Sequence, residues 1–110
     1  MAGGRSQPHR RELYREDSNG RSKPYASVLP SVAGTATNGQ TLTGTNGTFL
    51  PAGATVTRQW YRGGAPISGA TAGTYVLAAA DVGKRVYLVN TATNVYGSRT
   101  VASNPTATVA

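Results

Sequence analysis

The sequence predicts one small all-β domain built from short antiparallel strands. From residue 27 onward, turn signals rich in Gly, Asn and Pro recur about every eight to twelve residues, which is typical of a sandwich or barrel. The chain has 110 residues and 14 glycines, a composition that argues against a helical bundle. Between residues 55 and 62 the side chains alternate so that Trp60, the only tryptophan, points to one face of a strand.

We expect six or seven strands, and the first lie before Trp60. Residues 25–32 form an extended segment that Pro30 interrupts, which suits an edge strand. Residues 40–45 alternate with Leu42 inward, and a turn follows them. Phe49 comes next as a core residue.

The strand of Trp60 organises the middle of the chain. Burying its indole would remove roughly 150–250 Å² from water, which corresponds to about 4–6 kcal/mol. Two glycines at 63 and 64 predict a tight turn after this strand, and Ile67 marks a short return strand. Residues 74–77 then place Tyr75 and Leu77 on one face.

The last third of the chain predicts a helical turn and two or three more strands. Residues 78–83 form one helical turn, and within them Asp81 would cap the short turn of residues 81–83. The longest strand follows at 85–93, and extended segments at 98–103 and 106–109 end the chain. The predicted structural core is Leu42, Phe49, Trp60, Tyr75, Leu77, Asp81, Gly83, Val86 and Leu88.

The first 26 residues predict a basic N-terminal arm, and residues 27–110 predict the sandwich. Basic residues alternate with three acidic ones in this stretch, and few side chains are apolar, so it cannot bury enough surface to fold alone. We expect the arm to order on a partner, although a merely solubilising tail is the alternative. The predicted partner-binding residues are Arg5, Arg10, Arg11, Leu13, Tyr14, Arg15, Arg21, Lys23 and Tyr25.

The residue types exclude most catalytic and metal sites. The chain has no cysteine, which excludes disulfides and cysteine-based zinc sites. The single histidine, His9, lies in the arm, and Asp81 is the only acidic side chain of the predicted domain. Neither a Ser/His/Asp triad nor a pair of carboxylates can therefore form there. We expect no enzyme activity, no cofactor and no metal site.

The net charge indicates the kind of partner, and the hydropathy indicates whether the chain has a signal peptide or a membrane span. The formal net charge is +7 at pH 7, which favours an acidic or phosphate-bearing partner. No apolar stretch of a signal peptide follows Met1, and no run approaches the ~20 apolar residues of a membrane span. We expect neither a secretion signal nor a membrane segment.

Short motifs between residues 30 and 104 carry a family resemblance. They are the segments Gly39–Thr43, Thr45–Phe49, Gln59–Arg62, Ile67–Thr71, Thr74–Leu77, Asp81–Gly83, Thr91–Asn94 and Tyr96–Gly97. Together they resemble the bacterial and phage immunoglobulin-like repeat. This resemblance implies a two-sheet antiparallel sandwich with Trp60 between the sheets, and an Asp81-x-Gly83 turn that leads into the penultimate strand.

Three residues depart from the family pattern. Phe49 stands where the family often has tryptophan, Arg58 where it favours an aromatic residue, and Asn90 where it favours an apolar one. We expect Arg58 and Asn90 to lie at a sheet end, where their polar tips reach water. The alternative is that both side chains face a partner.

The resemblance implies a role in binding or display. In cellular proteins such repeats usually stand in tandem in long secreted adhesins, whereas one copy without an export signal fits a phage protein that assembles in the host cytoplasm. We expect a virion structural protein, specifically a capsid decoration (cement) protein. Its arm would bind the major capsid protein or another virion protein, and its domain would project outward.

Two other classes stay open. One is a tail, neck or fibre component that contacts host-surface glycans, with self-association as a further option. The other is a small basic nucleic-acid-binding protein, suggested by the charge of the arm. Single-strand binders interleave basic residues with exposed stacking rings, and the sequence offers few rings outside the predicted core, so nucleic acid is the less favoured partner.

Overall fold

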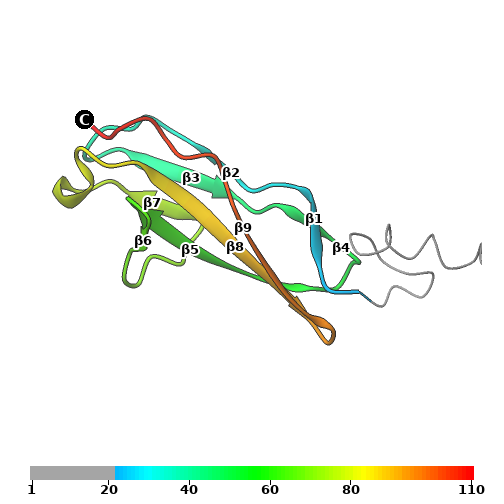
Figure 1. The fold of residues 1–110 in the computed structure, drawn as a ribbon. Coiled ribbons are helices and arrows are strands. Elements are labelled where there is room, and N and C mark those ends of the chain that lie inside the picture. Colours follow the sequence, from blue (N-terminus) through cyan, green and yellow to red (C-terminus); the bar gives the residue numbers. More distant parts are fainter. Residues whose placement is uncertain (1–21) are drawn as a thin grey trace, which may run out of the picture.

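The computed structural model describes residues 22–110, and this part of the chain is all-β with antiparallel sheets (Figure 1). The arrangement is consistent with a β-sandwich, and the predicted all-β class is confirmed. One 3₁₀ turn, η2 (Ala79–Asp81), interrupts the strands at the position where a helical turn was expected.

The described residues form nine strands, more than the six or seven expected. The first extended segment divides into two strands, and residues 48–50 form a short strand around Phe49. The expected return strand lies at residues 65–66, just before Ile67, and residues 106–109 form no strand. The strands are β1 (Tyr25–Val28), β2 (Ser31–Ala33), β3 (Thr41–Thr45), β4 (Thr48–Leu50), β5 (Thr55–Arg62), β6 (Ala65–Pro66), β7 (Thr74–Val76), β8 (Val86–Asn94) and β9 (Gly97–Ala102).

Three hydrogen-bonded sheets result. The largest has the order β6-β5-β8-β9, the second β2-β3-β7, and the third pairs β1 with β4. Between β1 and β2 the chain passes from the third sheet to the second, and Pro30 lies in this crossing. Proline cannot donate a ladder hydrogen bond, which explains why the strand breaks there.

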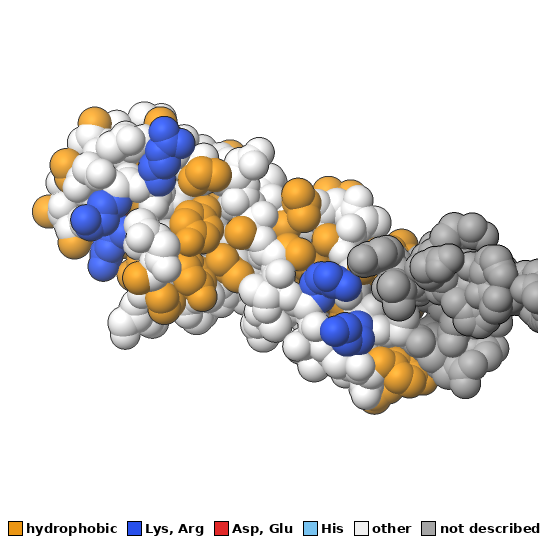
Figure 2. Space-filling model, viewed as in Figure 1, with side chains coloured by type: hydrophobic (Ala, Val, Ile, Leu, Met, Phe, Trp, Pro, Cys, Tyr) orange, Lys and Arg blue, Asp and Glu red, His pale blue; other side chains and the backbone are white. Residues whose placement is uncertain are grey.

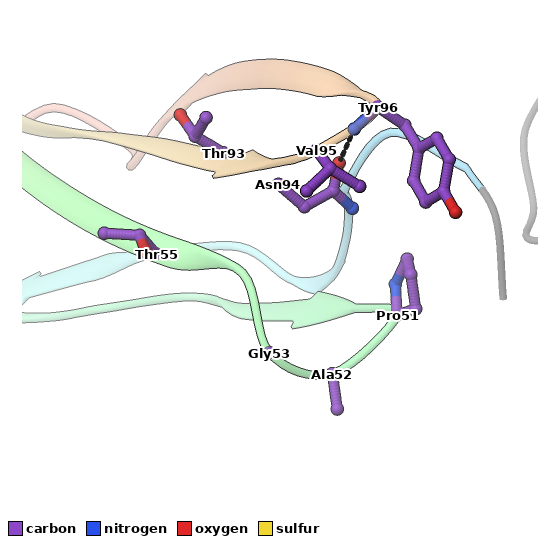
Figure 3. Close-up of a pocket in the computed structure, with 8 residues that line it drawn as sticks. All are labelled: Pro51, Ala52, Gly53, Thr55, Thr93, Asn94, Val95 and Tyr96. Atoms are coloured by element: carbon purple, nitrogen blue, oxygen red, sulfur yellow. Dashed lines mark hydrogen bonds between the residues drawn. The ribbon is translucent and has the colours of Figure 1, made fainter.

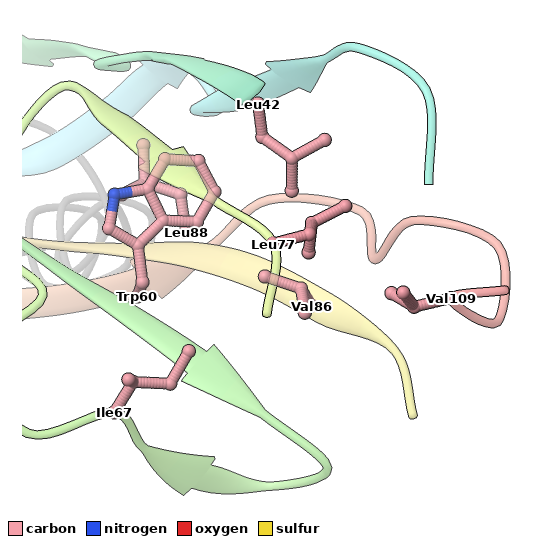
Figure 4. Close-up of a cluster of buried hydrophobic side chains, with 7 residues drawn as sticks. All are labelled: Leu42, Trp60, Ile67, Leu77, Val86, Leu88 and Val109. Carbon is pink, nitrogen blue, oxygen red and sulfur yellow. The ribbon is translucent and has the colours of Figure 1, made fainter. Parts of the chain in front are cut away.

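The main core lies between the four-stranded and three-stranded sheets (Figure 4). The Trp60 ring is fully buried, its Nε1 donates to the Ala72 carbonyl at 2.8 Å, and it stacks on Tyr75 with ring centroids 5.8 Å apart. Gly44 faces this indole. A Cβ at Gly44 would lie 2.9 Å from the indole and 2.8 Å from Leu88 Cδ2. The two sheets therefore approach closely at this point.

The core cluster contains Leu42, Trp60, Ile67, Leu77, Val86, Leu88 and Val109. Five of these residues belong to the core predicted from sequence. Phe49 is also buried, on β4, while Tyr75 is half-buried against the cluster and Gly83 is exposed. Val109 was not predicted, although it is only 2% exposed.

Asn90 corrects one expectation. Its side chain is fully buried and does not reach water at a sheet end. Its Oδ1 accepts from the Gly47 N–H at 2.9 Å, and its Nδ2 donates to Asn46 Oδ1 and to the Thr57 carbonyl. These bonds tie the turn between β3 and β4 to the four-stranded sheet, so Asn90 is a structural residue that faces no partner.

Candidate functional site

Most residues predicted to bind a partner lie outside the described part of the chain. Those are Arg5, Arg10, Arg11, Leu13, Tyr14, Arg15 and Arg21. The remaining two, Lys23 and Tyr25, lie in the folded part, where Lys23 is exposed and Tyr25 is half-buried at the start of β1. The fold thus includes residues 22–26, which the sequence analysis assigned to the arm.

Residues 22–25 pack on the tip of the β8–β9 hairpin. Asn94 Nδ2 donates to the Ser22 carbonyl at 2.8 Å, and Arg99 Nε donates to the Pro24 carbonyl at 3.1 Å. Pro24 is fully buried, and Tyr25 pairs with Leu50 on β4. These contacts fix where residue 22 enters the fold: at the end of the molecule opposite the C-terminus (Figure 1).

A groove opens at this same end, between the β4–β5 loop and the β8–β9 hairpin (Figure 3). Its volume is about 540 Å³, and Pro51, Ala52 and Gly53 line one side. Thr93 to Tyr96 line the other, where Asn94 Oδ1 accepts from the Tyr96 N–H at 2.8 Å. The lining has no charged side chain.

Large apolar side chains are exposed around this groove. Val95 is 89% exposed and Tyr96 is 48% exposed, and Leu50 at the end of β4 is at the margin of exposure. Isolated exposed apolar residues are normal on a protein surface, but a group beside a groove is typical of an interaction site. We name the groove and these three residues the arm-proximal end.

A second, smaller groove lies along the entering segment. It has a volume of about 310 Å³ and is lined by Tyr25, Ala26, Leu29, Arg99 and Val101. The Leu29 side chain is 59% exposed there. Tyr25, one of the residues predicted to bind a partner, thus contributes to a surface that the domain itself presents.

The only acidic side chain among residues 22–110 has a structural role. Asp81 is fully buried and accepts from Arg62 Nη1 at 2.7 Å, from the Tyr75 hydroxyl at 2.7 Å and from the Ala78 N–H at 2.8 Å. Burial alone would raise the pKa of Asp81, but the bonds from Ala78, Arg62 and Tyr75 outweigh burial and lower it. Asp81 was expected to cap a turn over residues 81–83. It is instead the last residue of η2, and its side chain accepts from the N–H of Ala78, the residue before η2.

The pKa values of the two side chains that donate to Asp81 are both raised. The hydrogen bond to Asp81 raises the pKa of Arg62 above its already high value. Burial and the bond to the Asp81 carboxylate raise the pKa of Tyr75 to about 12. Across the neutral range the network therefore stays ionised as Arg62⁺ and Asp81⁻ with a neutral Tyr75, which holds η2 against β5 and β7.

Residues 22–110 hold no cluster of three or more His, Cys, Asp or Glu side chains that could bind a metal ion. In that same range, no helix is long and apolar enough to cross a membrane. Comparison with family models, with curated proteins and with solved structures finds no match to this chain. The features that can indicate a function are therefore the geometry of the arm-proximal end and the distribution of charged residues along the chain.

Proposed function

We propose that this protein is a virion structural protein that binds a capsid shell as a decoration protein and projects an immunoglobulin-like domain outward. The observation that carries the proposal is that the start of the folded chain and the exposed apolar side chains lie together at the arm-proximal end. Residues 22–25 enter the fold beside the hairpin that bears Val95 and Tyr96. The arm and this end of the domain can therefore touch one surface together, while the C-terminal end points away from it (Figure 1).

The immunoglobulin-like assignment is supported by the sheet order and by the place of the tryptophan. A three-stranded and a four-stranded antiparallel sheet face each other, and Trp60 lies between them. The first extended segment changes sheet at Pro30. This architecture agrees with the sandwich that the motifs around Trp60 imply.

The charge pattern is consistent with an acidic shell surface. Residues 22–110 contain six basic side chains and one acidic one, and the acidic one is bound by Arg62. Exposed ion pairs contribute only ~0–1 kcal/mol each, so attachment also needs apolar anchors. Leu13 and Tyr14 of the arm and the exposed Val95 and Tyr96 can supply them.

Co-sedimentation with shells that lack this protein tests the proposal. Full-length protein should sediment with the shells, and deletion of residues 2–21 should weaken this binding at least about tenfold because the arm's contacts are lost. The double variant Val95→Ser/Tyr96→Ser should weaken it as well. The matched control is Val82→Ser, because Val82 is 47% exposed and follows η2, away from the arm-proximal end.

Two results would contradict the proposal. Equal sedimentation of the deletion and the full-length chain would show that the arm is no anchor. Binding unaffected by Val95→Ser/Tyr96→Ser would remove the arm-proximal end from the contact. If no shell binds the chain at all, the alternative of a tail, neck or fibre component becomes the better proposal.

A further inference from the structure

β9 forms an edge of the four-stranded sheet. It is the last strand in the order β6-β5-β8-β9, and it pairs with β8 in unbroken register from Gly97 to Ala102. The opposite edge strand, β6, has two residues, and one of them is Pro66. Short strands, prolines and bulges protect sheet edges against further pairing. β6 has two of these features, whereas β9, with six residues, has none of them.

The main-chain groups of every second residue of β9 point away from β8. The N–H of Ser103, the next residue, donates to the Leu88 carbonyl at 2.8 Å, which fixes the phase of the antiparallel ladder. Because the hydrogen-bonding direction alternates along a strand, the N–H and C=O groups of Ser98, Thr100 and Ala102 face outward. Among residues 22–110 no partner hydrogen-bonds to these groups, so the domain leaves them for another strand.

The residues between them turn their side chains to the other face of β9. Arg99 and Val101 line the smaller groove together with Tyr25 and Leu29. Leu29 is 59% exposed and Val101 is half-buried, so the groove offers apolar surface at the edge of the sheet. A strand added to β9 would bring its own alternate Cβ atoms to about 4.5–5.5 Å from those of Arg99 and Val101. Such a strand would gain side-chain contacts as well as ladder hydrogen bonds.

The charge beside this edge is positive. Arg99 donates its Nε to the Pro24 carbonyl at 3.1 Å, and within residues 22–110 this is the only bonded nitrogen of its guanidinium. The Lys23 side chain is exposed and lies against Gly97, where the absent Cβ leaves room for it. Asp81, the only acidic side chain in this range, is already bound in the network at η2. A charge that faces a covered edge opposes strand addition unless the incoming strand neutralises it, so a carboxylate is needed.

We propose that β9 binds an extended, acidic segment of a partner protein as an added antiparallel strand. The segment carries a carboxylate opposite Arg99 and an apolar side chain opposite Val101, and its main chain pairs with Ser98, Thr100 and Ala102. In this mode of recognition, main-chain hydrogen bonds supply affinity and alternate side chains supply specificity. The inference concerns the domain alone and does not rest on attachment to a shell.

A second copy of this chain is a poorer occupant of the edge. Two β9 strands paired antiparallel about Thr100 would place Arg99 of each copy opposite Val101 of the other. Neither arginine would then meet a carboxylate, and the two positive charges would come near each other. An acidic segment of another protein avoids both penalties.

Amide hydrogen exchange, measured by NMR on the full-length protein, tests the inference. The probe is a blocked synthetic peptide, Thr-Val-Thr-Val-Thr-Glu-Thr, and the matched peptide has lysine in place of glutamate. We expect the glutamate peptide to slow exchange at Ser98, Thr100 and Ala102, because their amides gain hydrogen bonds. Arg99 and Val101 are internal controls, since their amides face β8 with or without the peptide. The lysine peptide should bind at least about tenfold more weakly.

Two substitutions at one position separate the edge from the rest of the domain. Thr100→Pro removes an outward N–H without removing a bond to β8, and it should weaken binding of the glutamate peptide at least about tenfold. Thr100→Val keeps the N–H and the β-branch, so it should bind the peptide as the parent does. Arg99→Glu should reverse the preference, so that the lysine peptide binds more tightly than the glutamate peptide.

Unchanged exchange at all three edge amides in the presence of the glutamate peptide would overturn the inference. So would equal binding of the two peptides, or equal binding by Thr100→Pro and Thr100→Val. Slow exchange at these amides in the free protein would overturn it as well: loss of this protection on deletion of residues 2–21 would assign the edge to the arm, and loss on dilution would assign it to a second copy. Should Arg99→Glu fail to fold, the two peptides and the two Thr100 variants decide.

Discussion

Among single residues, Gly44 sets how closely the two sheets approach. It lies on β3, and its missing side chain makes room for the Trp60 indole and for Leu88, both fully buried. The space requirement explains why a glycine, which weakens a strand, occupies the interior of this one. A side chain at this position would collide with the Trp60 ring.

We therefore expect Gly44→Ala to destabilise the domain by about 1–3 kcal/mol, because the added methyl overpacks a buried site. Thermal melting should show a drop of roughly 4–8 °C per kcal/mol for a domain of this size. Gly73→Ala is the matched control, since its Cβ would meet nothing nearer than Arg58 Cζ at 4.0 Å. Equal melting of the two variants would mean that the sheets can separate at no cost.

Asp81 makes stability depend on pH. Its folded pKa is lowered, so its contribution is present above the unfolded pKa of ~3.9 and is lost as pH falls through the folded value. Tyr75 works in the opposite range: its folded pKa is about 12, so its contribution is complete below ~10 and disappears as pH rises towards 12. Both groups favour folding across the neutral range.

The variant Asp81→Asn should cost about 1.5–3 kcal/mol near neutral pH, because hydrogen bonds to a charged carboxylate are replaced by weaker ones. Melting temperatures between pH 7 and pH 3 provide the measurement. The gap between parent and variant should shrink below about pH 4, because the carboxylate of the unfolded parent begins to bind a proton there while the folded one, with its lowered pKa, stays ionised. A gap that stayed constant to pH 3 would contradict the role assigned to this carboxylate.

Among the secondary-structure elements, β1 is the one that the arm leads into, and the residues just before it pack on the domain. Ser22 and Pro24 hydrogen-bond to the β8–β9 hairpin, and Pro24 is buried. Residues 22–25 thus hold one end of β1 against a sheet to which β1 itself does not pair. Composition alone placed the start of the domain at residue 27, five residues after Ser22, where this packing begins.

Two deletions should separate the contributions of arm and strand. Deleting residues 2–21 should leave the melting temperature within a few degrees of the parent, because it spares every contact described from Ser22 onward. Deleting residues 2–25 should lower stability by about 1–3 kcal/mol, since it removes two hydrogen bonds and a buried proline. Circular dichroism melts decide the matter, and equal melting of the two deletions would contradict the packing of residues 22–25.

On the scale of the whole domain, the basic side chains of residues 22–110 do not gather into one nucleic-acid-binding surface. Arg62 is bound to Asp81, and Arg99 donates to Pro24. Figure 2 shows the basic side chains of its face near the two ends. The rings of Tyr61 and Tyr87 lie on a face without charge, so stacking and phosphate contacts cannot coincide there.

We accordingly expect no binding to single-stranded or duplex DNA at about 50 mM salt, as measured by fluorescence anisotropy of a labelled oligonucleotide. A chain without residues 2–21 serves as the control for the arm's own charge. Binding that falls steeply as salt rises, and that the deletion abolishes, would instead support the nucleic-acid class.

The sequence by itself determined the features that depend on local order. Alternation around Trp60 and Leu42 predicted which face of each of these strands would be buried, and spaced Gly, Asn and Pro residues predicted where strands would end. Asp81 was expected to cap a short turn, and it does, although it caps η2 from its last residue and not the turn of residues 81–83. These features follow from the period of a strand and from the chemistry of turns, which act over a few residues.

Only the tertiary structure decided the contacts between distant segments. Asn90 is buried because the turn at Asn46 and Gly47 satisfies its amide, and nothing near position 90 in the sequence signals that partner. Val109 enters the core because the chain end hydrogen-bonds to Lys84, which brings it back over β8. The arm-proximal end joins loops about forty residues apart. An alternation pattern of short period carries no information on contacts between distant segments, because the packing of whole sheets determines those contacts.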